Sequence, residues 1–346
     1  MRSIRRIKDD GVGFIKDVSE IIALEAWKDP ALIPDLSKDK TIFVFSDYSR
    51  AEEHYQTYSF YVFGRSGADY FNAVRKLLRE DFHLGRRHMS FKQLNDKIKL
   101  KALPAFLEIA GAIDGFVLTF AVDNRIQFMF AEQFLRVAPE LFSSVKKRVV
   151  EDMLRVVHFG AQAVMLAFST DQNIVWFTDS DNIVANEKYE VLFGRIAEAT
   201  IRTMFLSDEK VGHIGFGLTS VDDGSLEIED FAAVPDLVAG ALCETLSKLA
   251  QANLRVTPKI ILNRPRVSKK TNLICEWISK HQCPLKKFGV VFDKTGPYAG
   301  DWRPTFFHIK NLNIAAERPC CGGQHTTPHI REPIRFDIFE CSTRCD

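Results

Sequence analysis

Residues 41–47 read Thr41-Ile42-Phe43-Val44-Phe45-Ser46-Asp47, a run of β-branched and aromatic residues that ends at a carboxylate. Such a run predicts a buried strand. Further apolar runs end at Asp123 and at Asp179, and the run over 226–228 leads through two acids to Asp236. Several carboxylates at one end of a sheet can hold hard, oxygen-seeking cations.

The surrounding pattern predicts the fold class. A second run over 57–63 is expected to form a hairpin with the first strand, and further strands are predicted over 116–122, 173–178, 213–219 and 225–230. Helical spacing of apolar residues predicts helices over 11–29, 68–80, 91–111, 139–168, 187–205 and 235–251. A hairpin followed by alternating strands and helices predicts an α/β fold, with a mixed five- to six-stranded sheet and helices on both faces.

The chain divides into four predicted parts. An N-terminal helical arm over 1–40 precedes a core domain over 41–251, which is followed by a small C-terminal α+β extension over 252–315 and a tail over 316–346. The extension is expected to be a separate unit, with a strand near 259–262, a helix around 275–279 and strands over 288–293 and 304–309.

Composition narrows the class of protein. Apolar residues make up 46% of the 346 residues, which is enough for a sizeable core. The net charge of +1, from 46 basic and 45 acidic residues, excludes a strongly cationic coat but leaves room for a local basic groove.

The cellular location is predicted from the N-terminal sequence, the longest apolar stretch and the cysteines. The basic N-terminus lacks a following apolar region, and the longest apolar stretch, Leu103–Val122, carries two acids, so we expect neither a secretory signal nor a membrane span. The seven cysteines form no regular framework, which favours reduced thiols and a cytoplasmic protein.

Three motifs resemble a known family. The segment Phe43-Val44-Phe45-Ser46-Asp47-Tyr48-Ser49 resembles the opening Asp-Glu-Ser-Gly strand of the domain-of-unknown-function family numbered thirty-eight hundred. Val234-Pro235-Asp236-Leu237-Val238-Ala239-Gly240 resembles its closing Ala-Asp-Leu-x-Ala-Gly helix, and Val122-Asp123 resembles its middle strand. The likeness covers roughly 41–250 and implies a ribonuclease-H-like core with metal-dependent nuclease activity. Tyr48, Arg50 and Ala233 depart from the family's usual Glu, Gly and Gln.

The acids and the resemblance together predict a nuclease that uses one or two Mg²⁺ or Mn²⁺ ions. Asp47, Asp179 and Asp236 would be its catalytic carboxylates, and Asp123 and Asp181 would be further metal ligands.

Each acid also has an ordinary alternative. Asp123, Asp179 and Asp181 suit turns and helix caps. Asp236 follows Pro235 in what would be the first turn of a helix, where a negative charge stabilises the helix dipole. The Tyr48 departure favours a rival hypothesis, a catalytically degenerate ribonuclease-H-like module that binds nucleic acid or a protein partner. A metal-dependent nucleotide phosphohydrolase is a second alternative.

Basic residues between the core elements indicate a partner. Four of them are predicted to contact nucleic acid: Arg264, Arg266, Lys269 and Lys270. The alternative is a solvated charged face. The sequence indicates neither the kind of nucleic acid nor the oligomeric state.

The tail holds six residues of types that bind zinc: Cys320, Cys321, His325, His329, Cys341 and Cys345. Their spacing matches no standard zinc finger, so a flexible tail is favoured over a zinc-stapled one.

Overall fold

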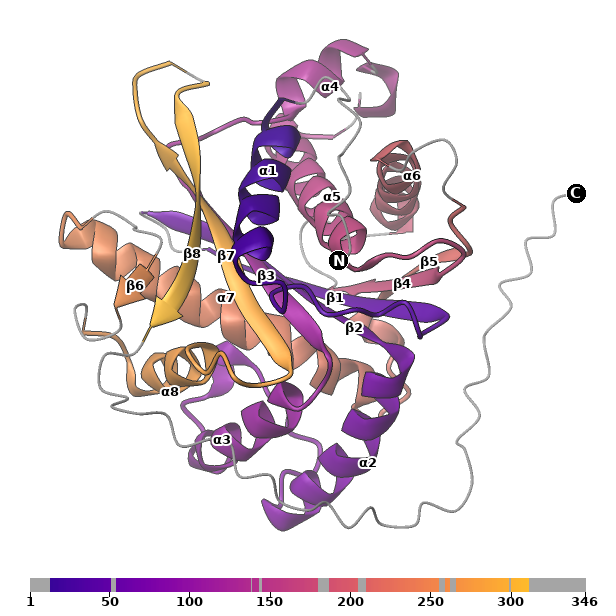
Figure 1. The fold of residues 1–346 in the computed structure, drawn as a ribbon, viewed down its shortest axis with the longest axis vertical. Coiled ribbons are helices and arrows are strands. Elements are labelled where there is room, and N and C mark those ends of the chain that lie inside the picture. The colour runs from indigo at the N-terminus through magenta and orange to yellow at the C-terminus, as the bar shows by residue number, and fades with distance from the viewer. Residues whose placement is uncertain are drawn as a thin grey trace, which may run out of the picture.

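The computed structural model describes residues 13–50, 54–137, 139–142, 145–179, 187–204, 210–254, 259–261, 266–298 and 300–310. Within these ranges the chain forms a mixed sheet of eight strands in the order β5-β4-β1-β2-β3-β7-β8-β6 (Figure 1). The strands are β1 Thr41–Arg50, β2 Tyr55–Gly64, β3 Gly115–Asp123, β4 Asn173–Thr178, β5 Ile214–Leu218, β6 Lys259–Ile261, β7 Leu285–Lys294 and β8 Trp302–Lys310.

Strand direction brings many strand ends to one edge of the sheet. β2 is antiparallel to both β1 and β3, whereas β4 is parallel to β1, β5 to β4 and β7 to β3. The carboxyl ends of β1, β3, β4, β5 and β7 therefore lie at the same edge.

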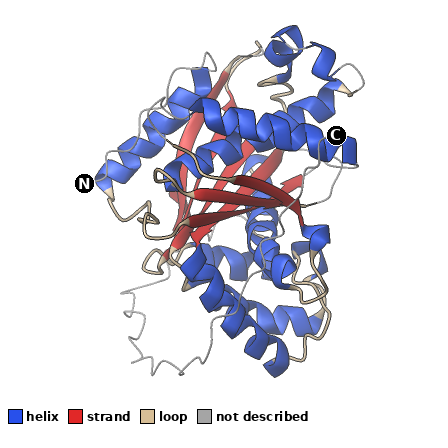
Figure 2. Ribbon diagram, turned by 90° about the vertical axis from the view of Figure 1, so that its right-hand side faces the viewer, coloured by secondary structure: helices blue, strands red, loops and turns tan. Residues whose placement is uncertain are grey.

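Helices cover both faces of the sheet (Figure 2). One face carries α1 Gly13–Lys28, α4 Ala131–Val137, α5 Lys147–Ala167 and α6 Glu187–Met204, and the other carries α2 Arg65–Asp81, α3 Lys97–Gly111, α7 Glu227–Gln251 and α8 Lys269–Ile278. Short 3-10 helices lie at η1 Phe91–Gln93, η2 Pro139–Phe142 and η3 Thr219–Val221. The predicted α/β class, with a mixed sheet between helices, is confirmed.

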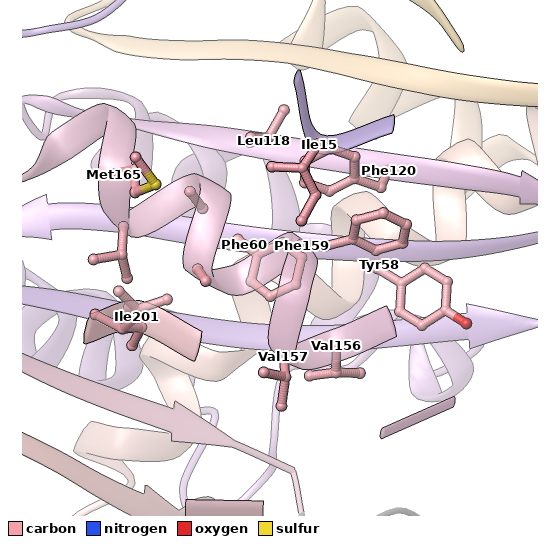
Figure 3. Close-up of a cluster of buried hydrophobic side chains, with 14 of the residues drawn as sticks. Ile15, Tyr58, Phe60, Leu118, Phe120, Val156, Val157, Phe159, Met165 and Ile201 are labelled. Atoms are coloured by element: carbon pink, nitrogen blue, oxygen red, sulfur yellow. The ribbon is translucent and has the colours of Figure 1, made fainter. Parts of the chain in front are cut away.

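The core on the α5 face combines aromatic and aliphatic side chains (Figure 3). Phe159 of α5 stacks on Phe120 of β3 with ring centroids 4.3 Å apart, and its ring lies 5.4 Å from that of Tyr58. Ile15 of α1 is fully buried in the same cluster. The segment expected to be an N-terminal arm is therefore part of the core.

The start of α7 differs from the prediction. Residues 225–230 were expected to form a strand and 235–251 a helix, but one helix begins at Glu227. The Asp222 carboxylate accepts the backbone N–H groups of Leu226, Ile228 and Glu229, which satisfies donors that a helix start leaves open. Acids at 227, 229 and 230 in the first turn suit the helix dipole. Pro235 therefore lies inside the helix rather than at its first position.

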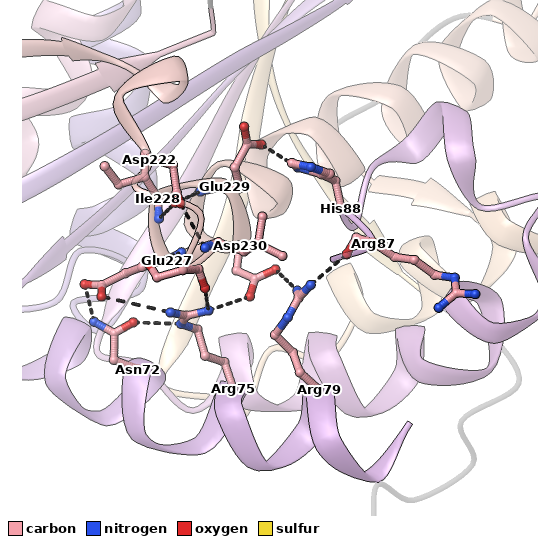
Figure 4. Close-up of polar contacts among 12 residues, drawn as sticks. Asn72, Arg75, Arg79, Arg87, His88, Asp222, Glu227, Ile228, Glu229 and Asp230 are labelled. Carbon is pink, nitrogen blue, oxygen red and sulfur yellow. Dashed lines mark hydrogen bonds and ion pairs between the residues drawn. The ribbon is translucent and has the colours of Figure 1, made fainter. Parts of the chain in front are cut away.

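A buried ionic network fixes this start against α2 (Figure 4). Arg75 and Arg79 of α2 donate to the two oxygens of Asp230 at 3.0 and 2.7 Å. Both Arg75 and Asp230 are 1% exposed. Asn72 binds Glu227 in the same network.

The C-terminal segment is not a separate unit. β7 pairs with β3 over Gly115–Val122 and β8 follows it, so these strands extend the main sheet. This addition explains why the sheet exceeds the five to six strands predicted. Among the helices within the described ranges, none has the length and apolar character needed to cross a membrane.

Candidate functional site

Asp47 and Asp179 are brought together by the pairing of β1 with β4. The parallel register ends at the pair Ser46 and Thr178, so Asp47 and Asp179 are the next residues on the two strands. Phe45 and Phe177, two residues earlier, stack with centroids 5.1 Å apart. Because strand side chains alternate in direction, Asp47 and Asp179 lie on the same face of the sheet as these two phenylalanines.

Asp236 lies over the same region from α7. Phe231 of α7 stacks on Phe45, with centroids 5.1 Å apart. Eight residues later, the carbonyl of Ala239 accepts the Thr57 hydroxyl at 2.8 Å. Asp236 falls between these two contacts, at the level of Asp47. The three acids predicted to be catalytic therefore lie on one face of the sheet, beyond the end of the β1–β4 pairing.

Asp236 is held by η1. Its Oδ2 accepts the backbone N–H of Phe91 at 2.6 Å. Lys270 donates to the Phe91 carbonyl at 2.8 Å, and its Nζ lies 4.1 Å from the centre of the Phe91 ring. A Cβ at Gly240 would come within 2.3 Å of that ring. Gly240 therefore makes room for the Phe91 ring against α7.

The electrostatics of Asp236 are unusual. Its pKa is raised to about 6, mainly by burial and in part by the charge of Asp179, although the Phe91 N–H and the charge of Lys92 act in the opposite direction. Asp236 and Asp47 are partly buried and Asp179 is exposed, so the group opens to solvent. A bound cation would favour the ionised form of such a buried acid.

The other two acids have local partners as well. Asp179 Oδ1 accepts the hydroxyl of Thr219 at 3.0 Å, and Asp47 Oδ1 accepts the backbone N–H of Tyr48 at 2.5 Å. The Tyr48 side chain points to the opposite face, where its hydroxyl binds that of Thr178 at 2.5 Å. A side chain at position 48 thus faces away from α7, and the Tyr48 departure removes no carboxylate from this site.

The donor chemistry fits a hard divalent cation, since carboxylate oxygens are its preferred ligands. The spacing fits less well: within the described part of the chain, no three His, Cys, Asp or Glu side chains converge closely enough to hold an ion. Asp181, one of the two further metal ligands predicted, lies outside the described residues.

Asp123 does not join this group. It lies four residues beyond Thr119. Thr119 pairs with Ser59 of β2, and Ser59 in turn pairs with Asp47 of β1. That places it about 13 Å further along the sheet and about 10 Å across it. Its carboxylate binds Arg125, with 2.5 Å between Oδ2 and the guanidinium, and accepts the Arg125 N–H at 2.9 Å. This geometry matches the interpretation of Asp123 as a turn residue.

The four residues predicted to contact nucleic acid lie in different environments. Arg266 and Lys269 are exposed at the start of α8, Lys270 contacts Phe91 beside Asp236, and Arg264 lies outside the described residues. The six cysteines and histidines of the tail also lie outside them.

Sequence reasoning did not identify Phe91, Lys92 or Thr219 as parts of this site. Phe91 and Lys92 fell in a basic stretch predicted as the start of a helix, and Thr219 contacts Asp179 across 40 residues. The Ala239-Gly240 pair was the available signal, because a glycine inside a helix indicates a close neighbour.

Comparison with known proteins adds no family. No protein-family model matches the chain, and no curated protein matches it. The resemblance to the family numbered thirty-eight hundred therefore stays a prediction.

Proposed function

We propose that this protein is a metal-dependent nuclease that hydrolyses phosphodiester bonds at Asp47, Asp179 and Asp236. One observation carries the proposal: three acids far apart in the sequence reach one face of the sheet at the end of the β1–β4 pairing. The raised pKa of Asp236, caused mainly by burial, is typical of functional sites rather than of surface acids.

We also infer a ribonuclease-H-like core over β5-β4-β1-β2-β3. Two antiparallel pairings next to two parallel ones support this inference, together with the resemblance in the first and last motifs. The proposed location is the cytoplasm. The thiols of Cys243, Cys275 and Cys283, the cysteines within the described ranges, are free, which fits that location.

The protein's own residues would position the reaction. Asp47, Asp179 and Asp236 would hold a divalent cation such as Mg²⁺ or Mn²⁺, which would supply Lewis-acid activation of water and stabilise negative charge on the phosphate. The Phe91 N–H fixes one oxygen of Asp236, leaving the other for binding. Thr219 orients Asp179 in the same way. No side-chain nucleophile is required.

The test is Mn²⁺-dependent cleavage of mixed DNA and RNA substrates by wild type, Asp47→Asn and Asp236→Asn. Both variants should lose cleavage while keeping the fold, because each removes one charged ligand. Asp123→Asn is the matched control, and it should stay active because Asp123 lies away from the group. Full activity in both site variants would refute the assignment.

A second candidate is a degenerate module that binds nucleic acid without cutting it. It is favoured by the spacing, since the described acids do not converge on an ion, and by the Phe91 N–H that already occupies one oxygen of Asp236. Millimolar Mn²⁺ should raise the melting temperature of a metal-binding nuclease, because a ligand of the native state stabilises it. A degenerate module would show no shift. Cleavage of nucleotides but not of polymers would favour a phosphohydrolase.

A further inference from the structure

A lysine stands beside the carboxylate group with its side chain exposed. Lys92 follows Phe91, whose N–H binds Asp236 at 2.6 Å. The positive charge of Lys92 lowers the pKa of the Asp236 carboxyl. The Lys92 side chain is exposed, so its ammonium group is open to solvent beside the residue whose backbone binds Asp236.

The fold fixes the backbone that carries Lys92. Three contacts hold Phe91 between α7 and α8: its N–H binds Asp236, its carbonyl accepts Lys270 at 2.8 Å, and its ring fills the space left by Gly240. Lys270 is engaged with the carbonyl and the ring of Phe91, so it acts as a positioning residue. The segment that presents Lys92 is thus pinned to the site from two helices.

Further positive charge lies near the start of α8. Arg266 and Lys269 are exposed at the start of α8, and the next residue, Lys270, contacts Phe91. Positive side chains at the edge of a carboxylate group by themselves disfavour binding of a metal cation there. They suit a ligand that brings its own negative charge, such as the phosphates of a nucleic-acid strand.

We propose that Lys92 contacts a phosphate of a nucleic-acid strand bound at the carboxylate group, and that Lys270 positions it through Phe91. A lysine ammonium is a compact charge that donates up to three hydrogen bonds, which suits a phosphate oxygen. This inference rests on the proposed function and names a substrate contact of the same site.

The test measures binding apart from cleavage. In an Asp47→Asn background, a labelled single-stranded oligonucleotide is titrated at several salt concentrations and followed by fluorescence anisotropy. Lys92→Met, which keeps the apolar stem, should weaken binding by about tenfold for all sequences and reduce the salt slope by about 0.7. Lys92→Arg should restore most of the affinity. Lys101→Met, at an exposed lysine on α3, is the matched control and should leave both quantities unchanged.

The outcomes separate this inference from the proposed function. Equal affinity and slope for Lys92→Met and the control would overturn the Lys92 contact even if the wild type cleaves. A selective loss at Lys92 without cleavage by the wild type would support the contact and refute the nuclease. If the wild type binds no oligonucleotide, with or without Mn²⁺, the inference is overturned together with the nucleic-acid substrate.

Discussion

Replacement of Asp236 by Asn should stabilise the protein at alkaline pH. The pKa of Asp236 rises from 3.8 to about 6 in the folded chain, mainly through burial. A raised pKa means that folding disfavours the ionised form, so stability is full below pH 4 and falls as pH rises toward 6. The cost of the charge reaches about 3 kcal/mol above pH 6, at 1.36 kcal/mol per pKa unit. Asn removes this cost, and its carbonyl oxygen can still accept the Phe91 N–H.

The assay is urea unfolding of wild type and Asp236→Asn at pH 5 and pH 8, with divalent cations removed by a chelator. The variant should be more stable by up to about 3 kcal/mol at pH 8, and the advantage should shrink at pH 5. Asp123→Asn is the control: it should lose stability at pH 8, because Asp123 binds Arg125 by charge-assisted hydrogen bonds. A variant that is equally or less stable than wild type at pH 8 would refute the reasoning.

Addition of Mn²⁺ extends the same experiment. If Asp236 is a metal ligand, saturating Mn²⁺ should recover stability in the wild type by about 2.7 kcal/mol at one hundred times the dissociation constant. Asp236→Asn should recover much less. Equal gains in both proteins would show that Mn²⁺ binds elsewhere.

Two further substitutions test the surroundings of the site. Asp230→Ala should cost about 3–5 kcal/mol, because it leaves Arg75 and Arg79 without their buried carboxylate; denaturant unfolding measures this, and a loss below 1 kcal/mol would contradict it. Gly240→Ala should cost about 1–3 kcal/mol by pushing the Phe91 ring from α7, and it should also weaken Mn²⁺ stabilisation. Unchanged stability and unchanged Mn²⁺ response in Gly240→Ala would mean that Phe91 does not depend on this glycine.

Much of the fold followed from local pattern. β1, β2, β3 and β4 appear where apolar runs predicted them, because a buried strand requires such runs whatever surrounds it. The errors occurred where local signals conflict. The predicted strand over 225–230 became the start of α7, since the capping carboxylate of Asp222 and the buried pairing of Asp230 with two arginines outweigh a short apolar run.

The candidate site shows the same division. The sequence alone showed which acids follow the predicted strands, and it therefore predicted which acids to consider. Only strand order decided that Asp179 lies beside Asp47 while Asp123 lies two strands away. The contribution of Phe91 and Lys92 depended on a contact across 145 residues.

By itself, then, the sequence determined the α/β class, the main strands and the acids at their ends. Tertiary structure decided where α7 begins, that the C-terminal strands extend the main sheet, and that Asp179 follows the strand beside Asp47 while Asp123 lies two strands away. The physical reason is range: strand propensity and apolar spacing act between near neighbours, whereas strand order, burial of charge and the pKa of Asp236 arise from segments that only folding brings together.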